Sequence, residues 1–387
     1  MDFNNTKIAF QDKNNADLNR ALLLFRTIEK PWMVKTGKIM LEVALKTRLP
    51  IGWATKPTIY RHFVGGETLE KCQPVVDTMA KSNVKSILDY SVEGKSTEQG
   101  IENAFQETLR SIENAGKNEN IPFAVFKPTA MVDTAVLKKI SFKQKITDDE
   151  QLQYKAFADR IDRLSSAAAD NNIRLLIDAE DYWFQDAIDE VVHEMMEKYN
   201  KHKVIVFNTL QMYRTDRLEY LKNLIARARE REFYAGVKFV RGAYMEKERA
   251  RAKEEGYPSP INPDKGTTDK MYDDALRVSM ENIDILHVFN GTHNEQSNIL
   301  LTELIKDQGL SKDDDRIYFS QLYGMSDHIS YNLANDGYNV AKYIPYGPVR
   351  HVAPYLIRRA EENTSVAGQT GRELSLILKE KQRRKKL

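Results

Sequence analysis

The sequence predicts an α/β protein whose core is a (β/α)8 barrel. Eight short apolar or β-branched segments follow one another along the chain. Stretches in which apolar residues recur every three or four positions separate these segments, as in amphipathic helices. Strands that alternate with helices pair in parallel, and eight parallel strands close into a barrel. No segment is followed by a Gly-x-Gly-x-x-Gly turn, so a doubly wound nucleotide-binding sheet is the less favoured alternative.

Each predicted strand is a short run bounded by turn residues. The eight runs are residues 86–90, 122–127, 173–178, 204–208, 235–241, 285–289, 316–320 and 339–344. The helical spacing is clearest at residues 184–196, between the third and the fourth predicted strands. We therefore expect a barrel domain over residues 61–370.

Two segments flank the predicted barrel. Residues 1–60 form a predicted helical arm, in which residues 16–48 read as one or two helices. The buried face of this arm is expected to carry Leu18, Ala21, Leu22, Phe25 and Ile28. Residues 371–387 form a predicted basic tail with a dense run of cations at 379–386. Such tails are usually solvated, and this one would add attraction to an anionic membrane surface.

The composition excludes several classes of protein. Lys plus Arg (58) nearly balances Asp plus Glu (56), so no global field recruits nucleic acid. The single cysteine, Cys72, cannot form an internal disulfide or a cysteine-based zinc site, which fits a reducing compartment. Neither a signal peptide, a transit peptide nor a membrane-spanning apolar run is evident. We expect a cytoplasmic protein whose membrane contact, if any, is peripheral, at the inner membrane of a bacterium.

Polar residues end most of the predicted strands. In a parallel barrel the reactive side chains lie at the C-terminal ends of strands, so these residues are candidates for a site. They are Lys127, Asp178, Glu180, Gln211, Lys238, Arg241, Thr292 and His293. Each one alone would fit a capping or surface residue. Their shared placement at one rim predicts a functional site.

Two groups of cations point to an anionic ligand. Lys238 and Arg241 are embedded in apolar sequence, and a buried cation needs an anionic partner. A phosphate, an electron-rich cofactor or an acidic residue of a neighbouring strand would serve. Arg358 and Arg359 are adjacent on a predicted helix, where their side chains point about 100° apart. Paired guanidinium groups suit a carboxylate, and a solvated pair is the alternative.

Several motifs occur in order along the chain. They are Ile-Asp-Ala-Glu at 177–180, Val-Arg-Gly-Ala-Tyr at 240–244, Gly-Thr-His-Asn at 291–294, Gln-Leu-Tyr-Gly-Met at 321–325, Tyr-x-Pro-x-Gly at 343–347, Tyr-Leu-Ile-Arg-Arg at 355–359 and Glu-Asn at 362–363. Together they resemble the motifs of proline dehydrogenases. The resemblance runs from about residue 63 to residue 365.

The resemblance implies a fold and an activity. The fold is a distorted (β/α)8 TIM barrel whose final helix lies over the barrel top, with FAD at the C-terminal ends of the strands. The activity is oxidation of L-proline to 1-pyrroline-5-carboxylate, the first step of proline catabolism, with electrons passed to a membrane quinone. A hydroxyproline dehydrogenase is the closest alternative. Because 387 residues leave no room for the aldehyde dehydrogenase domain of bifunctional relatives, the monofunctional type is expected.

The resemblance also implies roles for individual residues. Arg358 and Arg359 would hold the proline carboxylate, and Lys127 and Asp178 would form a charged wall beside substrate and flavin. With Tyr343 these five make up the implied catalytic set. The implied substrate contacts add Ala243, Tyr244, Leu322 and Tyr355. The implied flavin contacts are Gln211, Lys238, Val240, Arg241, Gly242, Ala243, Thr292, His293 and Glu362.

Two positions depart from the bacterial bifunctional pattern, which has Arg at the position of Lys238 and Trp at that of Met245. The segment 256–263 looks closer to the eukaryotic form.

A non-catalytic ligand-binding barrel is an alternative from another class of protein. A metal-dependent hydrolase is a second, with ligands that would be Asp178, Glu180, His287 and His293. The absence of any His-Glu-x-x-His spacing makes it weaker.

Overall fold

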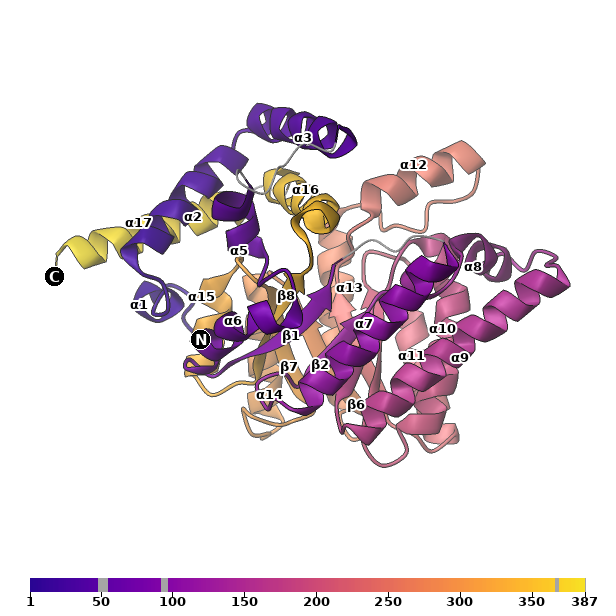
Figure 1. Cartoon of the computed structure of the whole chain (residues 1–387). Coiled ribbons are helices and arrows are strands. Elements are labelled where there is room, and N and C mark those ends of the chain that lie inside the picture. The colour runs from indigo at the N-terminus through magenta and orange to yellow at the C-terminus, as the bar shows by residue number, and fades with distance from the viewer. Residues whose placement is uncertain (48–54, 92–96, 366–368, 387) are drawn as a thin grey trace. The chain divides into compact units, whose positions relative to one another are not determined.

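The computed structural model describes residues 1–47, 55–91, 97–365 and 369–386. Its strands form a closed barrel in the order β1 to β8 (Figure 1). They are β1 (Val84–Tyr90), β2 (Phe123–Phe126), β3 (Arg174–Ile177), β4 (Val206–Gln211), β5 (Ala235–Val240), β6 (Leu286–Gly291), β7 (Ile317–Leu322) and β8 (Val340–Tyr346). The predicted (β/α)8 barrel is confirmed, and no predicted strand end differs from the observed one by more than three residues.

The chain divides into two compact units, unit 1 (Met1–Glu93 with Gln321–Leu387) and unit 2 (Gly94–Ser320). The helices of unit 1 are α1 (Thr6–Ala9), α2 (Asn15–Ile28), α3 (Pro31–Lys46), η1 (Lys56–Tyr60), α5 (Arg61–Phe63), α6 (Leu69–Ala80), α15 (Asp327–Asn335), α16 (Val349–Ser365) and α17 (Gln369–Lys385). Those of unit 2 are α7 (Glu98–Gly116), η2 (Pro128–Met131), α8 (Thr134–Ser141), α9 (Asp148–Asp170), α10 (Tyr182–Tyr199), α11 (Arg217–Glu230), α12 (Met245–Glu255), α13 (Lys265–Glu281) and α14 (Glu295–Asp307).

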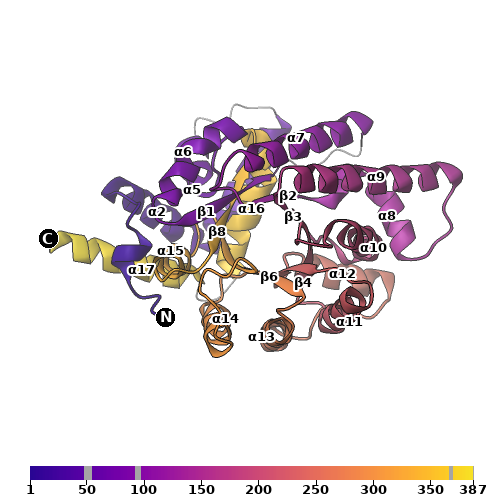
Figure 2. The ribbon, with the colours of Figure 1, turned by 90° about the horizontal axis from the view of Figure 1, so that it is seen from below.

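In unit 2, helices cover the outer side of the strands, and Figure 2 shows α9, α10, α11 and α13 in this position. The strands from β2 to β6 pair in parallel in sequence order. The helical spacing predicted at 184–196 is found in α10, which buries Ile188, Val191, Val192 and Met195. A capping box between Thr147 and Glu150 sets the start of α9. Local signals and burial therefore agree in this unit.

In unit 1, β1 pairs in parallel with β8, and the predicted arm forms α2 and α3. All five residues expected on the buried face of the arm are buried in α2. Several of them pack in one apolar cluster with Leu374, Leu376 and Ile377 of α17. The two ends of the chain thus share a core.

The basic run at 379–386 is not extended in solvent but lies in the last turns of α17. Arg383 and Arg384 both bind the buried Glu380 carboxylate. Arg384 also donates hydrogen bonds to the carbonyls of Phe10 (2.9 Å) and Lys13 (2.8 Å). Burial opposes the charge of Glu380, but the hydrogen bonds from the two arginines outweigh it and lower its pKa to about 2. These cations tie α17 to the N-terminal arm.

Candidate active site

Lys238 and Asp178 form an ion pair at the C-terminal ends of unit 2 strands. Lys238 of β5 is buried, and its Nζ donates to Asp178 Oδ1 at 2.5 Å. Asp178 follows β3 directly, where its backbone N–H donates to the Phe126 carbonyl. Lys238 therefore pairs with an acidic residue, as one alternative expected, but the expectation of a neighbouring strand was wrong, because Asp178 follows β3 and the neighbours of β5 are β4 and β6.

Arg241 lies just beyond the end of β5 and is only partly buried. Its Nε donates to Asp269 Oδ1 (2.6 Å), and its two terminal nitrogens donate to Thr292 Oγ1 (2.6 Å) and Ser297 Oγ (3.0 Å). The guanidinium also lies 4.4 Å from the ring centroid of Tyr272. Of its five N–H groups, these bonds use three. Among the described residues, two remain to bind a ligand from a fixed orientation.

Gly242 allows the backbone after β5 to turn sharply. Its φ is +124°, and a Cβ at this position would lie 2.5 Å from the Tyr213 ring. Glycine is therefore required here on both conformational and steric grounds. The turn is held by hydrogen bonds from Met212 N–H to the Val240 carbonyl and from Tyr213 N–H to the Arg241 carbonyl, each 2.8 Å. Gly242 and the next residue, Ala243, are exposed.

Glu180 is a buried carboxyl that the sequence analysis placed among the rim candidates and considered as a metal ligand. Its oxygens accept from Thr129 N–H (2.8 Å) and Thr129 Oγ1 (2.7 Å). Gln211, one of the implied flavin contacts, is buried at the end of β4 and donates to the Glu180 carbonyl at 2.6 Å. Burial raises the Glu180 pKa to about 7, although the Thr129 bonds and the charge of Lys127 act in the opposite direction. Lys127 itself caps η2 after β2 and is half-buried.

The proposed metal ligands do not come together. His287 is the second residue of β6, whereas His293 follows the other end of the same strand. Burial, with the charge of Arg174, lowers the His287 pKa to about 4. Over the described ranges, no three potential metal-ligating side chains form a cluster. Thr292 instead accepts the hydrogen bond from Arg241.

Unit 1 carries most of the remaining predicted substrate contacts. Arg359 and Tyr355 of α16 are both buried, and the guanidinium lies 5.2 Å from the Tyr355 ring centroid. Arg358 is half-buried. This burial of Arg359 differs from that expected for a solvated pair. Tyr343 is buried in β8, and its carbonyl accepts from Tyr323 N–H at 2.8 Å.

Three further predicted residues are less informative. Leu322 ends β7 and is half-buried, and Tyr244 precedes α12 with similar exposure. The side chain of Glu362 lies outside the described residues. The roles of all the predicted contacts stay predictions.

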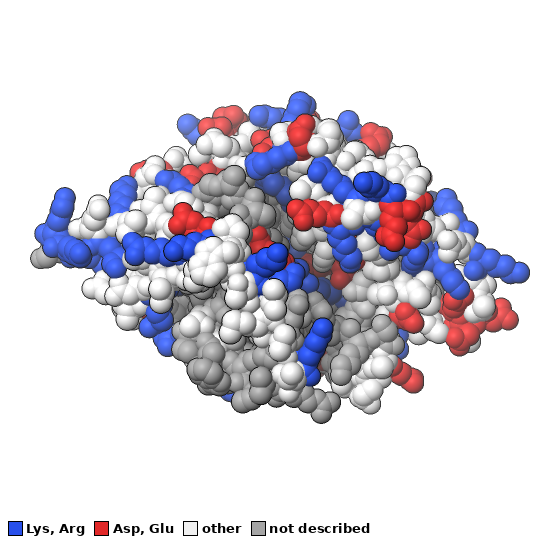
Figure 3. Space-filling view, turned by 90° about the horizontal axis from the view of Figure 1, so that it is seen from above, with Lys and Arg blue, Asp and Glu red and all other residues white. Residues whose placement is uncertain are grey.

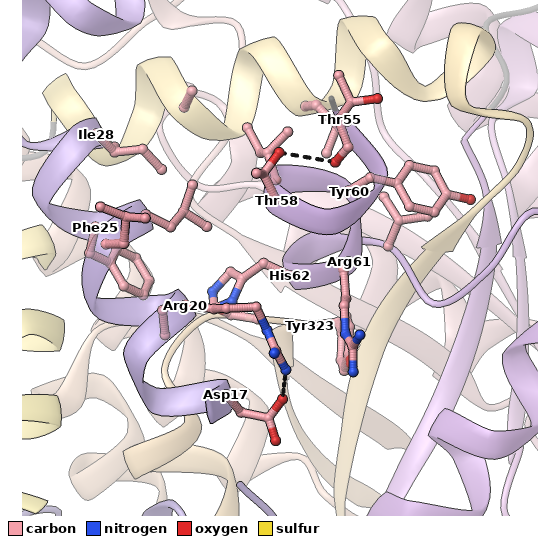
Figure 4. Close-up of a pocket in the computed structure, with 18 of the residues that line it drawn as sticks. Asp17, Arg20, Phe25, Ile28, Thr55, Thr58, Tyr60, Arg61, His62 and Tyr323 are labelled. Carbon is pink, nitrogen blue, oxygen red and sulfur yellow. Dashed lines mark hydrogen bonds and ion pairs between the residues drawn. The ribbon is translucent and has the colours of Figure 1, made fainter. Parts of the chain in front are cut away.

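A cavity of about 970 Å³ lies within unit 1 (Figure 4). Its wall includes parts of α2, α3, α5 and α16, and none of the predicted site residues lines it. The close-up shows the Asp17–Arg20 ion pair at one side and the hydrogen bond from Thr58 Oγ1 to the Thr55 carbonyl at another. No sequence signal indicated it, because its wall comes from segments far apart in the chain.

The exposed charges are mixed in sign. On the face shown in Figure 3, acidic and basic side chains are interspersed. This agrees with the formal net charge of +2. In the part of the chain that the structure describes, no helix is both long and apolar enough to cross a membrane.

A family model described as proline dehydrogenase matches residues 72–372. The carbapenem antibiotics biosynthesis protein CarD of Pectobacterium carotovorum is 34% identical over 83% of this chain and 83% of its own length. Human mitochondrial proline dehydrogenase 1 is 41% identical over 62% of this chain and 40% of its own length. A hydroxyproline dehydrogenase of Xenopus laevis is 30% identical over 97% of this chain and 88% of its own length.

Among solved structures, proline utilization A from Bdellovibrio bacteriovorus, inactivated by N-propargylglycine, superposes with a TM-score of 0.77 at 18% identity. The match covers 93% of this chain and 43% of that one. This likeness shows the fold. The chain thus spans less than half of two of these relatives.

Proposed function

The chain belongs to the proline dehydrogenase family of oxidoreductases, and on this premise we propose that it oxidises L-proline to 1-pyrroline-5-carboxylate with bound FAD and passes the electrons to a quinone. The observation that carries the proposal is the pair of oriented cations on β5 and directly after it, with Asp178 at the end of β3. There Lys238 is paired with Asp178, and Arg241 keeps two N–H groups for an anion. A non-catalytic barrel that binds an anionic ligand would fit this arrangement as well, and the family match favours the enzyme.

The residues of unit 2 fit an anionic cofactor. Arg241 would bind a phosphate group, because its guanidinium is held by Asp269, Thr292 and Ser297 before any ligand arrives. The exposed turn at Gly242 lets a ligand approach the backbone without a side chain in the way. Bound FAD would supply the acceptor for a hydride, while the protein binds and orients.

The residues of α16 fit the substrate carboxylate. Arg359 is buried against the Tyr355 ring, which limits the positions of its planar guanidinium. With Arg358 it would hold one end of proline and so direct the opposite edge of the ring. In the reaction, the carbon beside the ring nitrogen loses a hydride and the nitrogen loses a proton, which leaves a C=N double bond. A neutral amine is therefore the reactive form.

The direct test is the visible spectrum of the purified protein without oxygen. We expect a bound flavin that proline bleaches, because two electrons pass from the substrate to it.

The carboxylate assignment is tested by variants. Arg358→Lys and Arg359→Lys should each lose on the order of 2–5 kcal/mol in kcat/KM, because lysine keeps the charge but loses the planar fork. Arg350→Lys, on an exposed position of the same helix, is the control. Changes within twofold in both site variants would overturn the carboxylate assignment.

The cofactor assignment has a separate readout. Arg241→Ala should purify folded but depleted in FAD, since its guanidinium would no longer offset the phosphate charge. Arg229→Ala removes an exposed Arg–Asp ion pair elsewhere in unit 2 and should retain FAD. A fully loaded Arg241→Ala protein would contradict the assignment.

A hydroxyproline dehydrogenase is the second candidate, because a relative with that name matches 97% of the chain. Tyr343 is buried in β8 and would exclude a ring hydroxyl by filling its space. Tyr343→Ser should narrow the kcat/KM preference for proline over hydroxyproline. Bleaching by hydroxyproline but not by proline in the parent protein would favour the second candidate.

A further inference from the structure

Helix α3 presents apolar side chains on two opposite faces. Trp32, Ile39, Met40 and Val43 are 66%, 52%, 68% and 51% exposed. At 100° per residue they fall within about one third of the helix circumference, so they form one outward stripe. These four side chains are among only eleven large hydrophobic ones recorded as exposed over the described residues. We call them the α3 stripe.

The opposite face of α3 is covered by the protein. Val34 and Leu41 pack against the apolar cluster that includes Tyr355 and Leu356 of α16. Lys38 Nζ binds Glu361 Oε1 of α16 at 2.7 Å. Figure 1 shows α3 alongside α16, both in unit 1. The α3 stripe is therefore not needed to hold the helix in place, and its exposure has a cost in water.

The charges around the stripe have one dominant sign. Residues 30–47 contain four lysines and one glutamate. Lys35 and Lys46 are exposed, and they form no ion pair with any residue that the structure describes. On the helix circumference both lie at one edge of the α3 stripe. An apolar stripe with a tryptophan and a lysine border is the pattern of a helix that lies in the interface of an anionic bilayer.

We propose that the α3 stripe docks the protein on the surface of an anionic lipid bilayer. The apolar side chains enter the boundary between headgroups and acyl chains, while Lys35 and Lys46 contact lipid phosphates. The last turns of α17 contribute less, because Arg383 and Arg384 already bind Glu380 and the N-terminal arm. The docking surface is thus apolar and formed by the arm rather than by the basic run.

A second copy of the chain fits the stripe less well. A standard protein interface buries about 800 Å² per partner, more than four side chains of one helix provide. A two-fold pairing through this helix would also bring like-charged lysines together. A bilayer has neither requirement, because it accepts a narrow apolar stripe and supplies negative charge along both sides.

The test is flotation of the full-length protein with phosphatidylcholine vesicles made with or without phosphatidylglycerol. We expect binding that is stronger with phosphatidylglycerol and weakens with salt. In a Trp53→Phe background, which removes the tryptophan outside the described residues, the fluorescence of Trp32 should shift to the blue on binding, and the shift should be absent when Trp32→Phe is added. Trp183 is buried and should not respond.

Two sets of variants separate the stripe from general surface effects. Ile39→Ser/Met40→Ser/Val43→Ser should weaken vesicle partitioning by at least about tenfold, or 1.4 kcal/mol. Leu152→Ser removes an equally exposed leucine from α9 in unit 2 and should bind as the parent does. Lys35→Ala/Lys46→Ala should reduce only the gain from phosphatidylglycerol. Lys385→Ala/Lys386→Ala tests the basic run.

Three results of the vesicle experiments would overturn the proposal. They are absence of vesicle binding, equal binding by the triple variant, and loss of binding only in Lys385→Ala/Lys386→Ala. A concentration-dependent dimer without vesicles, abolished by the triple variant, would assign the stripe to a second copy instead. Oxidation of proline with a soluble dye as acceptor should be the same in all these variants. The proposed function can therefore fail while lipid docking stands, and the reverse.

Discussion

Two buried lysines of the barrel, Lys238 in β5 and Lys342 in β8, are each paired with an aspartate but differ in their surroundings. Lys342 donates to Asp327 Oδ1 (2.8 Å) and to the carbonyls of Met325 (2.7 Å) and Leu322 (3.3 Å). Lys238 binds Asp178, whose side chain is 16% exposed, compared with 11% for Asp327. Three acceptors satisfy all three donors of the Lys342 ammonium.

The difference separates a structural charge from a candidate binding charge. Lys342 lies in unit 1 and fixes the turn between β7 and α15, with Lys13 3.6 Å from the other oxygen of Asp327. Lys238 lies in unit 2 at the rim where the predicted ligand contacts gather. A buried lysine in a barrel strand is thus no indication of a ligand by itself. What distinguishes the two cases is that Lys342 closes the turn between β7 and α15, whereas Lys238 lies among the predicted rim contacts, and only the structure shows this.

The largest expected effect is on stability when Lys342 is removed. Lys342→Met should lower the free energy of unfolding by about 3–5 kcal/mol, because it leaves a buried carboxylate and two carbonyls with fewer donors. Urea denaturation measures this loss. Lys13→Met, which keeps the Lys342–Asp327 pair, should lose much less and is the variant to use if the first does not fold. Equal small losses in both would mean that the contacts of Lys342 with Asp327, Met325 and Leu322, here called the Lys342 network, do not stabilise the fold.

Lys238→Met should reduce activity more than stability. We expect a loss of about 1–3 kcal/mol in stability, since Asp178 is slightly more exposed than Asp327 (16% against 11% of the side chain) and can be hydrated, together with a larger loss in kcat/KM for proline. Urea denaturation and steady-state kinetics on the same preparation give both numbers. A stability loss equal to that of Lys342→Met, with normal kinetics in the folded fraction, would remove the distinction between the two lysines.

Acid should weaken the Lys342 network specifically. Burial opposes the charge of Asp327, but Lys342 and Lys13 outweigh it and lower its pKa to about 2 from 3.8. Because the folded-state pKa is the lower one, the stabilisation is complete above pH 3.8 and is lost as pH falls through 2. About 1 kcal/mol should be lost between pH 5 and pH 3. In Asp327→Asn the free energy of unfolding should not show this loss between pH 5 and pH 3. A loss equal to that of the parent would contradict the assignment of the acid response to Asp327.

A second pH effect, opposite in sign, concerns Glu180, near the Lys238 pair. Its folded-state pKa of about 7 lies above the ordinary 4.5, so the unfolding free energy should be highest below pH 4.5 and fall as pH rises to 7. We also expect a change of a few fold in kcat/KM near pH 7, because the charge beside Lys127 changes. Glu180→Gln should lack both, whereas the exposed Glu219→Gln should keep them. If Glu180→Gln leaves the pH dependence of kcat/KM near pH 7 unchanged, the Glu180 carboxyl is not the group responsible for it.

The sequence analysis found the strands and the rim residues because both depend on local pattern. Residues 235–241 gave the fifth strand, and the expectation that Lys238 needs an anionic partner followed from the apolar residues around it. Its partner could not be named, since Asp178 lies 60 positions away and comes close only through the barrel. Lys342 was not singled out, although its sequence context is equally apolar.

The order of apolar and polar residues by itself determined the barrel, because strand and helix periods are properties of short segments. It also indicated the rim cations, the arginine pair and the buried face of α2. Only the tertiary structure decided which charges neutralise one another, which end of β6 carries His287, and that the 379–386 run binds the arm. It alone showed the exposed face of α3, because exposure depends on which neighbours cover a helix, and those neighbours come from distant parts of the chain.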